Sequence, residues 1–191
     1  MKSFIRKYIG TLFLTQRFFA ASSVCIVLFV LNFFLPWMGI VPYAALLVLC
    51  FLLAYDYALL YPGTRGLFAV RSHAERLSNG DENEIRIDIE NFYSFKVNVE
   101  VIDEIPHQFQ RRDLHFYVTL EAGTTKVLKY YLRPVKRGQY EFGKINLFTA
   151  SPVKLLNRKF IMGEPTEVPV YPSYLQLRKY QLMAISNRLS E

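Results

Sequence analysis

The sequence predicts a membrane α-helical hairpin followed by an all-β domain, an antiparallel immunoglobulin-like β-sandwich. The first observation is a long stretch, residues 18–55, that contains no Asp, Glu, Lys, Arg or His. The second is the period-two alternation of apolar and polar residues after residue 61, which is typical of strands with one buried face. The chain of 191 residues is therefore expected to divide into a basic N-terminal segment (1–17), a two-span hairpin (18–60), a sandwich (61–172) and a C-terminal segment (173–191).

The predicted spans are Phe18–Leu35 and Ile40–Leu60, separated by Pro36-Trp37-Met38-Gly39. A helix needs about 17–25 apolar residues to cross a bilayer, and both segments reach that length. Pro and Gly end helices and Trp favours the membrane interface, so the residues between the spans predict a tight turn. A cleaved signal peptide, a buried helix pair in a soluble core and a single re-entrant dip fit less well, because two charge-free spans follow each other directly.

The basic residues around the spans predict the orientation of the hairpin. Four precede the first span and three follow the second, whereas the turn between the spans has none; they are Lys2, Arg6, Lys7, Arg17, Arg65, Arg71 and Arg76. Lys and Arg remain on the cytoplasmic side of a membrane. We therefore expect a multi-pass protein of the inner (cytoplasmic) membrane, in contact with the lipid bilayer and with both termini in the cytoplasm.

Three features near the spans carry further expectations. Apolar and basic residues interleave within Met1–Arg17, which fits either a short helix along the lipid headgroups or an extension of the first span. Asp56 lies about one turn before the end of the second span, where we expect headgroups and water to hydrate it. Cys25 and Cys50 fall inside the spans, so we expect small buried apolar side chains and no disulfide framework.

The alternating runs predict about seven short strands between Arg65 and Pro172, a number typical of a sandwich. The candidates are Leu67–Arg76, Ile85–Glu90, Val97–Val101, His115–Leu120, Thr125–Arg133, Tyr140–Leu147 and Glu167–Tyr171. No long helical pattern intervenes, which disfavours a parallel sheet built from βαβ units. Residues 173–191 mix leucines with basic residues in a ragged pattern that only partly fits a helix.

No combination of residues predicts catalysis, a metal site or a cofactor. The three histidines, His73, His107 and His115, are scattered, and no zinc-binding or nucleotide-binding motif occurs. Asp103 and Glu104 precede His107, but without a nucleophile they indicate only a strand end that runs into an exposed turn. Basic pairs lie at expected turns, which favours a solvated surface or contact with anionic lipid over nucleic-acid binding.

The most distinctive run is residues 131–143, Tyr-Leu-Arg-Pro-Val-Lys-Arg-Gly-Gln-Tyr-Glu-Phe-Gly. A strand is expected to end at Pro134, and the chain to re-enter a strand after the turn Lys136-Arg137-Gly138. Gly138 is expected to adopt a backbone conformation that other residues resist. This turn is the one structural or interaction site that the sequence predicts.

Together with Ser151-Pro152, Asn157-Arg158 and Val170-Tyr171-Pro172, this run resembles a bacterial and archaeal family, domain of unknown function 58. The resemblance covers residues 10–180. It implies a hairpin and sandwich followed by a domain similar to von Willebrand factor A, of which residues 173–191 would be the start. Two departures stand out: Pro152-Val153-Lys154-Leu155 replaces the family's Pro-Leu-Gly-Leu, and no Asp-x-Ser-x-Ser metal motif occurs before Glu191.

The resemblance also implies partners, namely a MoxR-type AAA+ ATPase and von Willebrand factor A-like proteins, in envelope assembly, complex maturation or stress tolerance. The first hypothesis is thus a non-enzymatic membrane-anchored scaffold with a cytoplasmic β-sandwich. The second is an outward-facing sandwich that binds envelope glycans or acts as an enzyme, with a pocket lined by His107, His115 and nearby acids. A third, nucleic-acid binding, predicts steep loss of affinity with salt. The oligomeric state stays open.

Overall fold

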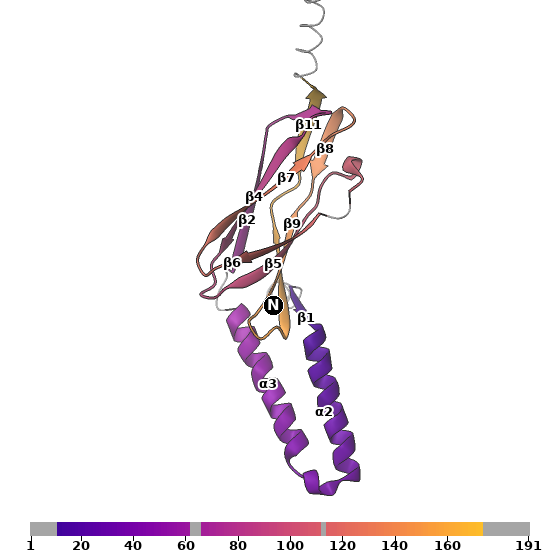
Figure 1. Ribbon diagram of the computed structural model, residues 1–191, viewed down its shortest axis with the longest axis vertical. Helices are drawn as coiled ribbons and strands as arrows, with labels where there is room; N and C mark the ends of the chain where they lie inside the picture. The colour runs from indigo at the N-terminus through magenta and orange to yellow at the C-terminus, as the bar shows by residue number, and fades with distance from the viewer. Residues whose placement is uncertain (1–10, 62–65, 112–113, 174–191) are drawn as a thin grey trace, which may run out of the picture.

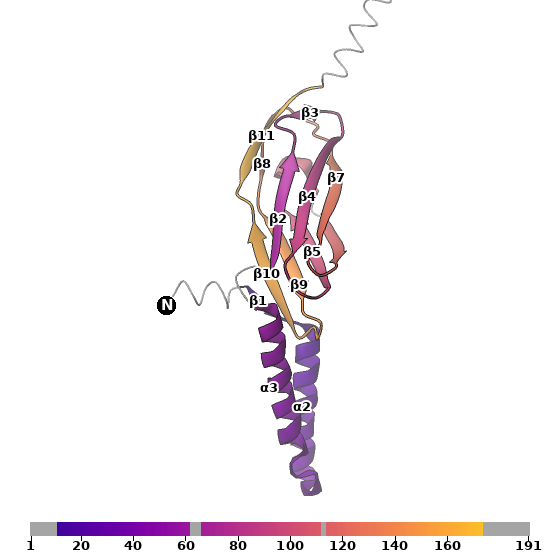
Figure 2. The ribbon, with the colours of Figure 1, turned by 90° about the vertical axis from the view of Figure 1, so that its left-hand side faces the viewer.

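In the computed structural model, a helical hairpin extends from one end of a β-sandwich (Figures 1 and 2). The fold class predicted from the sequence is therefore confirmed. The structure describes residues 11–61, 66–111 and 114–173. The expected helix at 173–191 and most of the basic N-terminal segment lie outside these residues, as does Arg65.

The hairpin consists of α2 (Gln16–Phe34), the short 3-10 helix η1 (Pro36–Met38) and α3 (Val41–Leu60). Both long helices have a mean hydropathy of 2.0 and are long enough to cross a membrane. Across the hairpin, the rings of Phe29 and Tyr43 meet edge-on with centroids 5.2 Å apart. The turn lies where Pro36 and Gly39 predicted it, and Gly39 has a positive φ of 45° that favours glycine.

The residues just before α2 form a strand, which neither expectation for the basic N-terminal segment included. Residues 12–14 make β1 (Leu12–Leu14), which pairs antiparallel with β10 (Leu156–Met162). The Lys159 amide also donates to the Thr11 carbonyl oxygen (2.7 Å). Residues 12–14 therefore neither lie along a membrane as a helix nor extend α2, because their main chain covers the edge of β10.

The described strands form three sheets. One has the order β1-β10-β9-β5-β6, with β9 (Ile145–Ala150), β5 (Val97–Asp103) and β6 (His115–Leu120). Another has the order β2-β4-β7, with β2 (Leu67–His73), β4 (Asn83–Asn91) and β7 (Thr125–Leu132). The third has the order β3-β11-β8, with β3 (Leu77–Asn79), β11 (Thr166–Pro172) and β8 (Gly138–Phe142). A second short 3-10 helix, η2 (His107–Phe109), follows β5.

One expected strand is divided in the structure, another is shorter than expected, and β1, β3 and β10 were not expected. The run Tyr140–Leu147 breaks into β8 and β9 at Gly143-Lys144, where both residues exchange backbone hydrogen bonds with Glu104. The run Leu67–Arg76 ends as a strand at His73, and the separate strand β3 begins after it, at Leu77; β2 pairs with β4, whereas β3 pairs with β11. At Gly143-Lys144 the alternation changes phase, because the buried apolar positions before it are Tyr140 and Phe142 and those after it are Ile145 and Leu147.

The core lies between the facing sheets. Ile85, Ile87 and Ile89 of β4 are completely buried, and the alternating valines Val97, Val99 and Val101 of β5 are buried in the same cluster. Tyr140 and Phe142 also lie inside, as their strand pattern predicted. Leu60, the last residue of α3, belongs to this cluster, so the core continues to the end of the hairpin.

Candidate functional site: the junction of hairpin and sandwich

The hairpin meets the sandwich at the loop between β9 and β10, residues 151–155. Figure 1 shows this loop reaching between the ends of α2 and α3. The Lys154 amide donates to the Ser151 hydroxyl (3.0 Å), and Lys154 itself has a left-handed backbone with φ 63°. The loop therefore makes a tight turn whose main chain faces the helix ends.

Thr15 connects the start of α2 to this loop. Its hydroxyl accepts from the Phe18 amide (3.4 Å), as an N-cap residue does, and donates toward the carbonyl oxygens of Lys154 (2.7 Å) and Leu155 (3.0 Å). The Thr15 amide also donates to the Leu155 carbonyl oxygen (3.1 Å). One residue thus ends β1, caps α2 and fixes the loop.

Asp56 connects α3 to the same loop from the other side. Its side chain is fully buried (0% exposed), and its Oδ2 accepts from the amides of Leu155 (3.0 Å) and Leu156 (2.9 Å). The expectation that headgroups and water hydrate Asp56 is therefore wrong. The loop covers the carboxylate and replaces water with two backbone donors, while Oδ1 has no protein partner among the described residues.

Arg158 of β10 lies buried against the end of α3. Its Nη1 donates to the Leu60 carbonyl oxygen (2.5 Å), and the Tyr93 hydroxyl donates to the same atom (2.9 Å). The guanidinium carbon lies 4.2 Å from the Tyr61 ring centre and 4.5 Å from that of Phe160. A cation here complements the negative end of the helix dipole. Burial raises the pKa of Tyr93, so its hydroxyl remains a donor.

Gly66 lies where the chain passes between Tyr93 and Phe160. A Cβ atom at this position would lie 2.5 Å from the Tyr93 hydroxyl oxygen and 2.7 Å from the Phe160 Cζ. We expect Gly66→Ala to displace Tyr93 from the Leu60 carbonyl and to destabilise the junction by about 1–3 kcal/mol, as overpacking does. Chemical unfolding of the full chain in detergent measures this change.

Gly123→Ala is the comparison variant, because its Cβ would meet nothing within 4 Å and its cost is backbone strain alone. The rate of hydrogen exchange of the backbone amides near Arg158 should rise only in Gly66→Ala. Equal effects in both variants would show that space around Gly66 is not limiting.

A second buried polar cluster lies inside the sandwich. Arg71 and Asp103 form an ion pair with side chains only 8% and 0% exposed, and the Tyr130 hydroxyl donates to the same carboxylate. Arg71 also donates to the Gly143 carbonyl oxygen (3.1 Å) and lies over the Phe142 ring. Burial, with the Asp103 charge, raises the pKa of Tyr130. These partners satisfy one another, which indicates a structural role.

This cluster corrects one expectation from the sequence and refines another. Asp103 is the last residue of β5, at the strand end that the sequence predicted, but its own side chain is buried. Arg71 was counted among the cations that flank the second span, whereas it lies within β2 and pairs in the core. Arg76, counted with it, lies over the Tyr171 ring at β11. Neither residue therefore supports the orientation of the hairpin.

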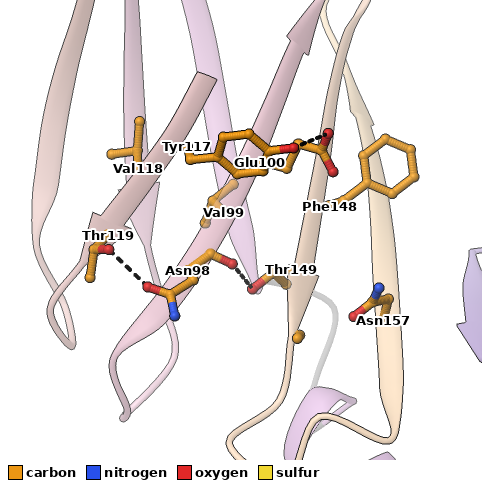
Figure 3. Close-up of a pocket in the computed structure, with 10 residues that line it drawn as sticks. Asn98, Val99, Glu100, Tyr117, Val118, Thr119, Phe148, Thr149 and Asn157 are labelled. Atoms are coloured by element: carbon orange, nitrogen blue, oxygen red, sulfur yellow. Dashed lines mark hydrogen bonds between the residues drawn. The ribbon is translucent and has the colours of Figure 1, made fainter. Parts of the chain in front are cut away.

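A hollow of about 370 Å³ lies on the outer face of the five-stranded sheet (Figure 3). It is lined by Asn98, Glu100, Tyr117, Thr119, Phe148, Asn157 and their neighbours. Glu100 Oε1 accepts from the Tyr117 hydroxyl (3.2 Å) and lies 3.0 Å from the His115 Nδ1. The bond to Glu100 raises the pKa of Tyr117. A second groove of about 300 Å³ lies between β2 and the β10–β11 connection.

The predicted turn Lys136-Arg137-Gly138 is exposed and lies just before and at the start of β8. Gly138 has a φ of 138°, as expected, and the Tyr140 hydroxyl donates to the Lys136 carbonyl oxygen (2.9 Å). The turn contacts neither the junction nor the hollow. Neither the hollow nor the groove is lined by His107 or His115. No group of three potential metal ligands occurs among the described residues.

No protein-family model and no curated protein sequence matches the chain. Among solved structures, the CARDB domain of the PF1109 protein from Pyrococcus furiosus is similar, with a TM-score of 0.37 and 14% identity over 56% of this chain and 93% of that chain. The ASH/PapD-like domain of human CEP192 has a TM-score of 0.37 and 12% identity, and covers 60% and 92%.

The alpha-2-macroglobulin of Escherichia coli is also similar, with a TM-score of 0.44 and 16% identity. The match covers 56% of this chain but only 16% of that chain. Similarity at these levels neither places the chain in a family nor indicates a function.

Proposed function

We propose that the chain is a non-enzymatic, membrane-anchored interaction protein whose hairpin crosses the cytoplasmic membrane twice. The most apolar segments of α2 and α3 are only 6% and 17% buried within the protein. Large apolar side chains cover the exposed surface of the hairpin, among them Phe33, Trp37 and Ile40. A lipid bilayer removes this surface from water, which supports the anchor.

The observation that carries the proposal is the junction, in which both helices hydrogen-bond the same loop. Thr15 holds the loop from α2, and Asp56 holds it from α3. Arg158 adds a third, buried connection to the end of α3. A sandwich fixed in this way presents its faces at a defined height above the membrane, and tethering raises its local concentration for partners there.

The orientation follows from cations that lie at the sandwich end of the hairpin. Arg17 and Lys154 are exposed there, and the turn at the other end, Pro36–Met38, contains no charged residue. Since Lys and Arg remain in the cytoplasm, these cations support a sandwich on the cytoplasmic face. The opposite orientation belongs to the second candidate, an outward-facing sandwich that binds envelope glycans.

The partners follow from the resemblance to the domain-of-unknown-function-58 family. A MoxR-type AAA+ ATPase would act on or through the sandwich, with von Willebrand factor A-like proteins in the same assembly. Envelope assembly or stress tolerance is the corresponding process. Binding of the purified ATPase to the full chain in nanodiscs, compared with binding to empty nanodiscs, tests the proposed partner. Equal binding to both would exclude the ATPase as a partner.

Labelling of single cysteines tests the orientation. In a chain with Cys25 and Cys50 replaced by alanine, we expect Met38→Cys to react in intact cells with a membrane-impermeant thiol reagent. Val135→Cys, on the exposed surface of the sandwich, should react only after the membrane is opened. Labelling of Val135→Cys in intact cells would show that the sandwich lies outside the cytoplasmic membrane, and would favour the glycan-binding candidate.

A further inference from the structure

Strand β6 (His115–Leu120) leaves one edge of the five-stranded sheet open. It is the last strand in the order β1-β10-β9-β5-β6 and pairs only with β5 among the described residues. The main-chain groups on its other side therefore lack a strand partner within the part of the chain that the structure describes. Such a row of groups is a template for another extended chain.

The other end strands carry features that prevent strand addition, and β6 does not. Strands β1 and β3 have three residues each, β7 contains Lys126 and Lys129, and β8 contains Glu141. Strand β2 contains Arg71, whose charge points into the sandwich, and inward-pointing charges also protect an edge. The sequence of β6, His-Phe-Tyr-Val-Thr-Leu, contains no Lys, Arg, Asp, Glu, Pro or Gly. Short length and charge are the usual protections of an edge, so β6 is the unprotected edge among the described strands.

The hollow lies directly beside this edge. Figure 3 shows Tyr117 and Thr119 of β6 next to Glu100 and Asn98 of β5, on the outer face of the sheet. Tyr117 is 79% exposed, although aromatic side chains favour burial. An added strand would place alternate side chains on this same face, beside Tyr117 and over the hollow.

The chemistry of the edge and the hollow identifies the occupant. Main-chain donors and acceptors at strand spacing are matched by an extended polypeptide, not by a lipid or a small molecule. Glu100 supplies the carboxylate that lines the hollow, with one oxygen, Oε2, that no described hydrogen bond uses. A Lys or Arg side chain beside it gains a charge-assisted hydrogen bond.

We propose that β6 binds an extended, basic segment of a partner protein as an additional strand, with one Lys or Arg placed over Glu100. This deepens the proposed function, because it names the surface and the kind of segment through which the sandwich interacts. It does not depend on the orientation of the hairpin, since the cysteine labelling described above and peptide binding are read out separately.

The test uses the full chain in nanodiscs and two fluorescent peptides in which valine alternates with lysine or with glutamate. We expect the lysine peptide to bind, measured by anisotropy, and to slow hydrogen exchange of the β6 amides but not of the β7 amides. Tyr117→Lys should weaken binding by about tenfold or more, since it places a like charge on the edge. Glu100→Gln should weaken it less and remove the preference over the glutamate peptide.

Val127→Lys is the matched control, because Val127 is a half-exposed residue on β7, an end strand of another sheet. It should leave binding unchanged. Equal affinity for both peptides, protection on β7, or no binding of the lysine peptide up to millimolar concentration would each overturn the proposal. Dimers of the chain that Tyr117→Lys dissociates would likewise overturn it, because a second copy would then occupy the edge.

Discussion

Asp103→Ala is expected to destabilise the sandwich by about 3–5 kcal/mol, because it leaves the buried Arg71 guanidinium without its counter-ion. Arg71 retains only the Gly143 carbonyl oxygen, and the Tyr130 hydroxyl loses its acceptor. Guanidinium-induced unfolding of the full chain in detergent, followed by the circular dichroism of the strands, measures the loss. Asp103→Asn preserves the shape of the side chain and should cost less.

The double variant Arg71→Met, Asp103→Leu distinguishes the effect of the two charges on stability from the effect of the volume that the two side chains fill. With both charges removed, most of the lost stability should return, because apolar residues of similar volume replace buried ion pairs well. Asp88→Ala serves as the control on the outer face of β4, where solvent screens the charge. A double variant as unstable as Asp103→Ala would show that the cluster's geometry, not charge compensation, maintains the core.

The sequence predicts most of the fold because its signals are local. Absence of charge defines the spans to within two residues, and period-two alternation locates most of the strands. The failures come from pairing between distant segments. Leu12–Leu14 is a strand because β10 lies beside it, and Tyr140–Leu147 is two strands because Glu104 binds the chain between them. Nothing near these residues in the sequence indicates either partner.

The candidate site was largely missed for the same reason. Asp56 is buried by amides that lie 99 and 100 residues further along the chain. In the sequence, Arg71 follows the second predicted span, but in the structure it pairs with Asp103 in the core. Ser151-Pro152 and Asn157-Arg158, which in the sequence supported only a family resemblance, lie in or next to the β9–β10 loop.

Asp56→Ala is expected to loosen the contact between α3 and the β9–β10 loop. The amides of Leu155 and Leu156 would lose their acceptor in a buried site, and each such donor costs about 1–3 kcal/mol. Because Thr15 and Arg158 still hold the junction, we expect local opening rather than global unfolding. Hydrogen exchange of these two amides should accelerate at least about tenfold, whereas exchange in β4 should not change.

Asp56→Asn provides the matched control, since its amide oxygen replaces one acceptor without the charge, and its effect should be smaller. Spin labels at Met38 and Val135 report the angle between hairpin and sandwich, and their distance distribution should broaden in Asp56→Ala alone. An unchanged distribution would mean that Thr15 and Arg158 suffice. A distribution that broadens only in Asp56→Ala would show that this carboxylate fixes the angle between the hairpin and the sandwich.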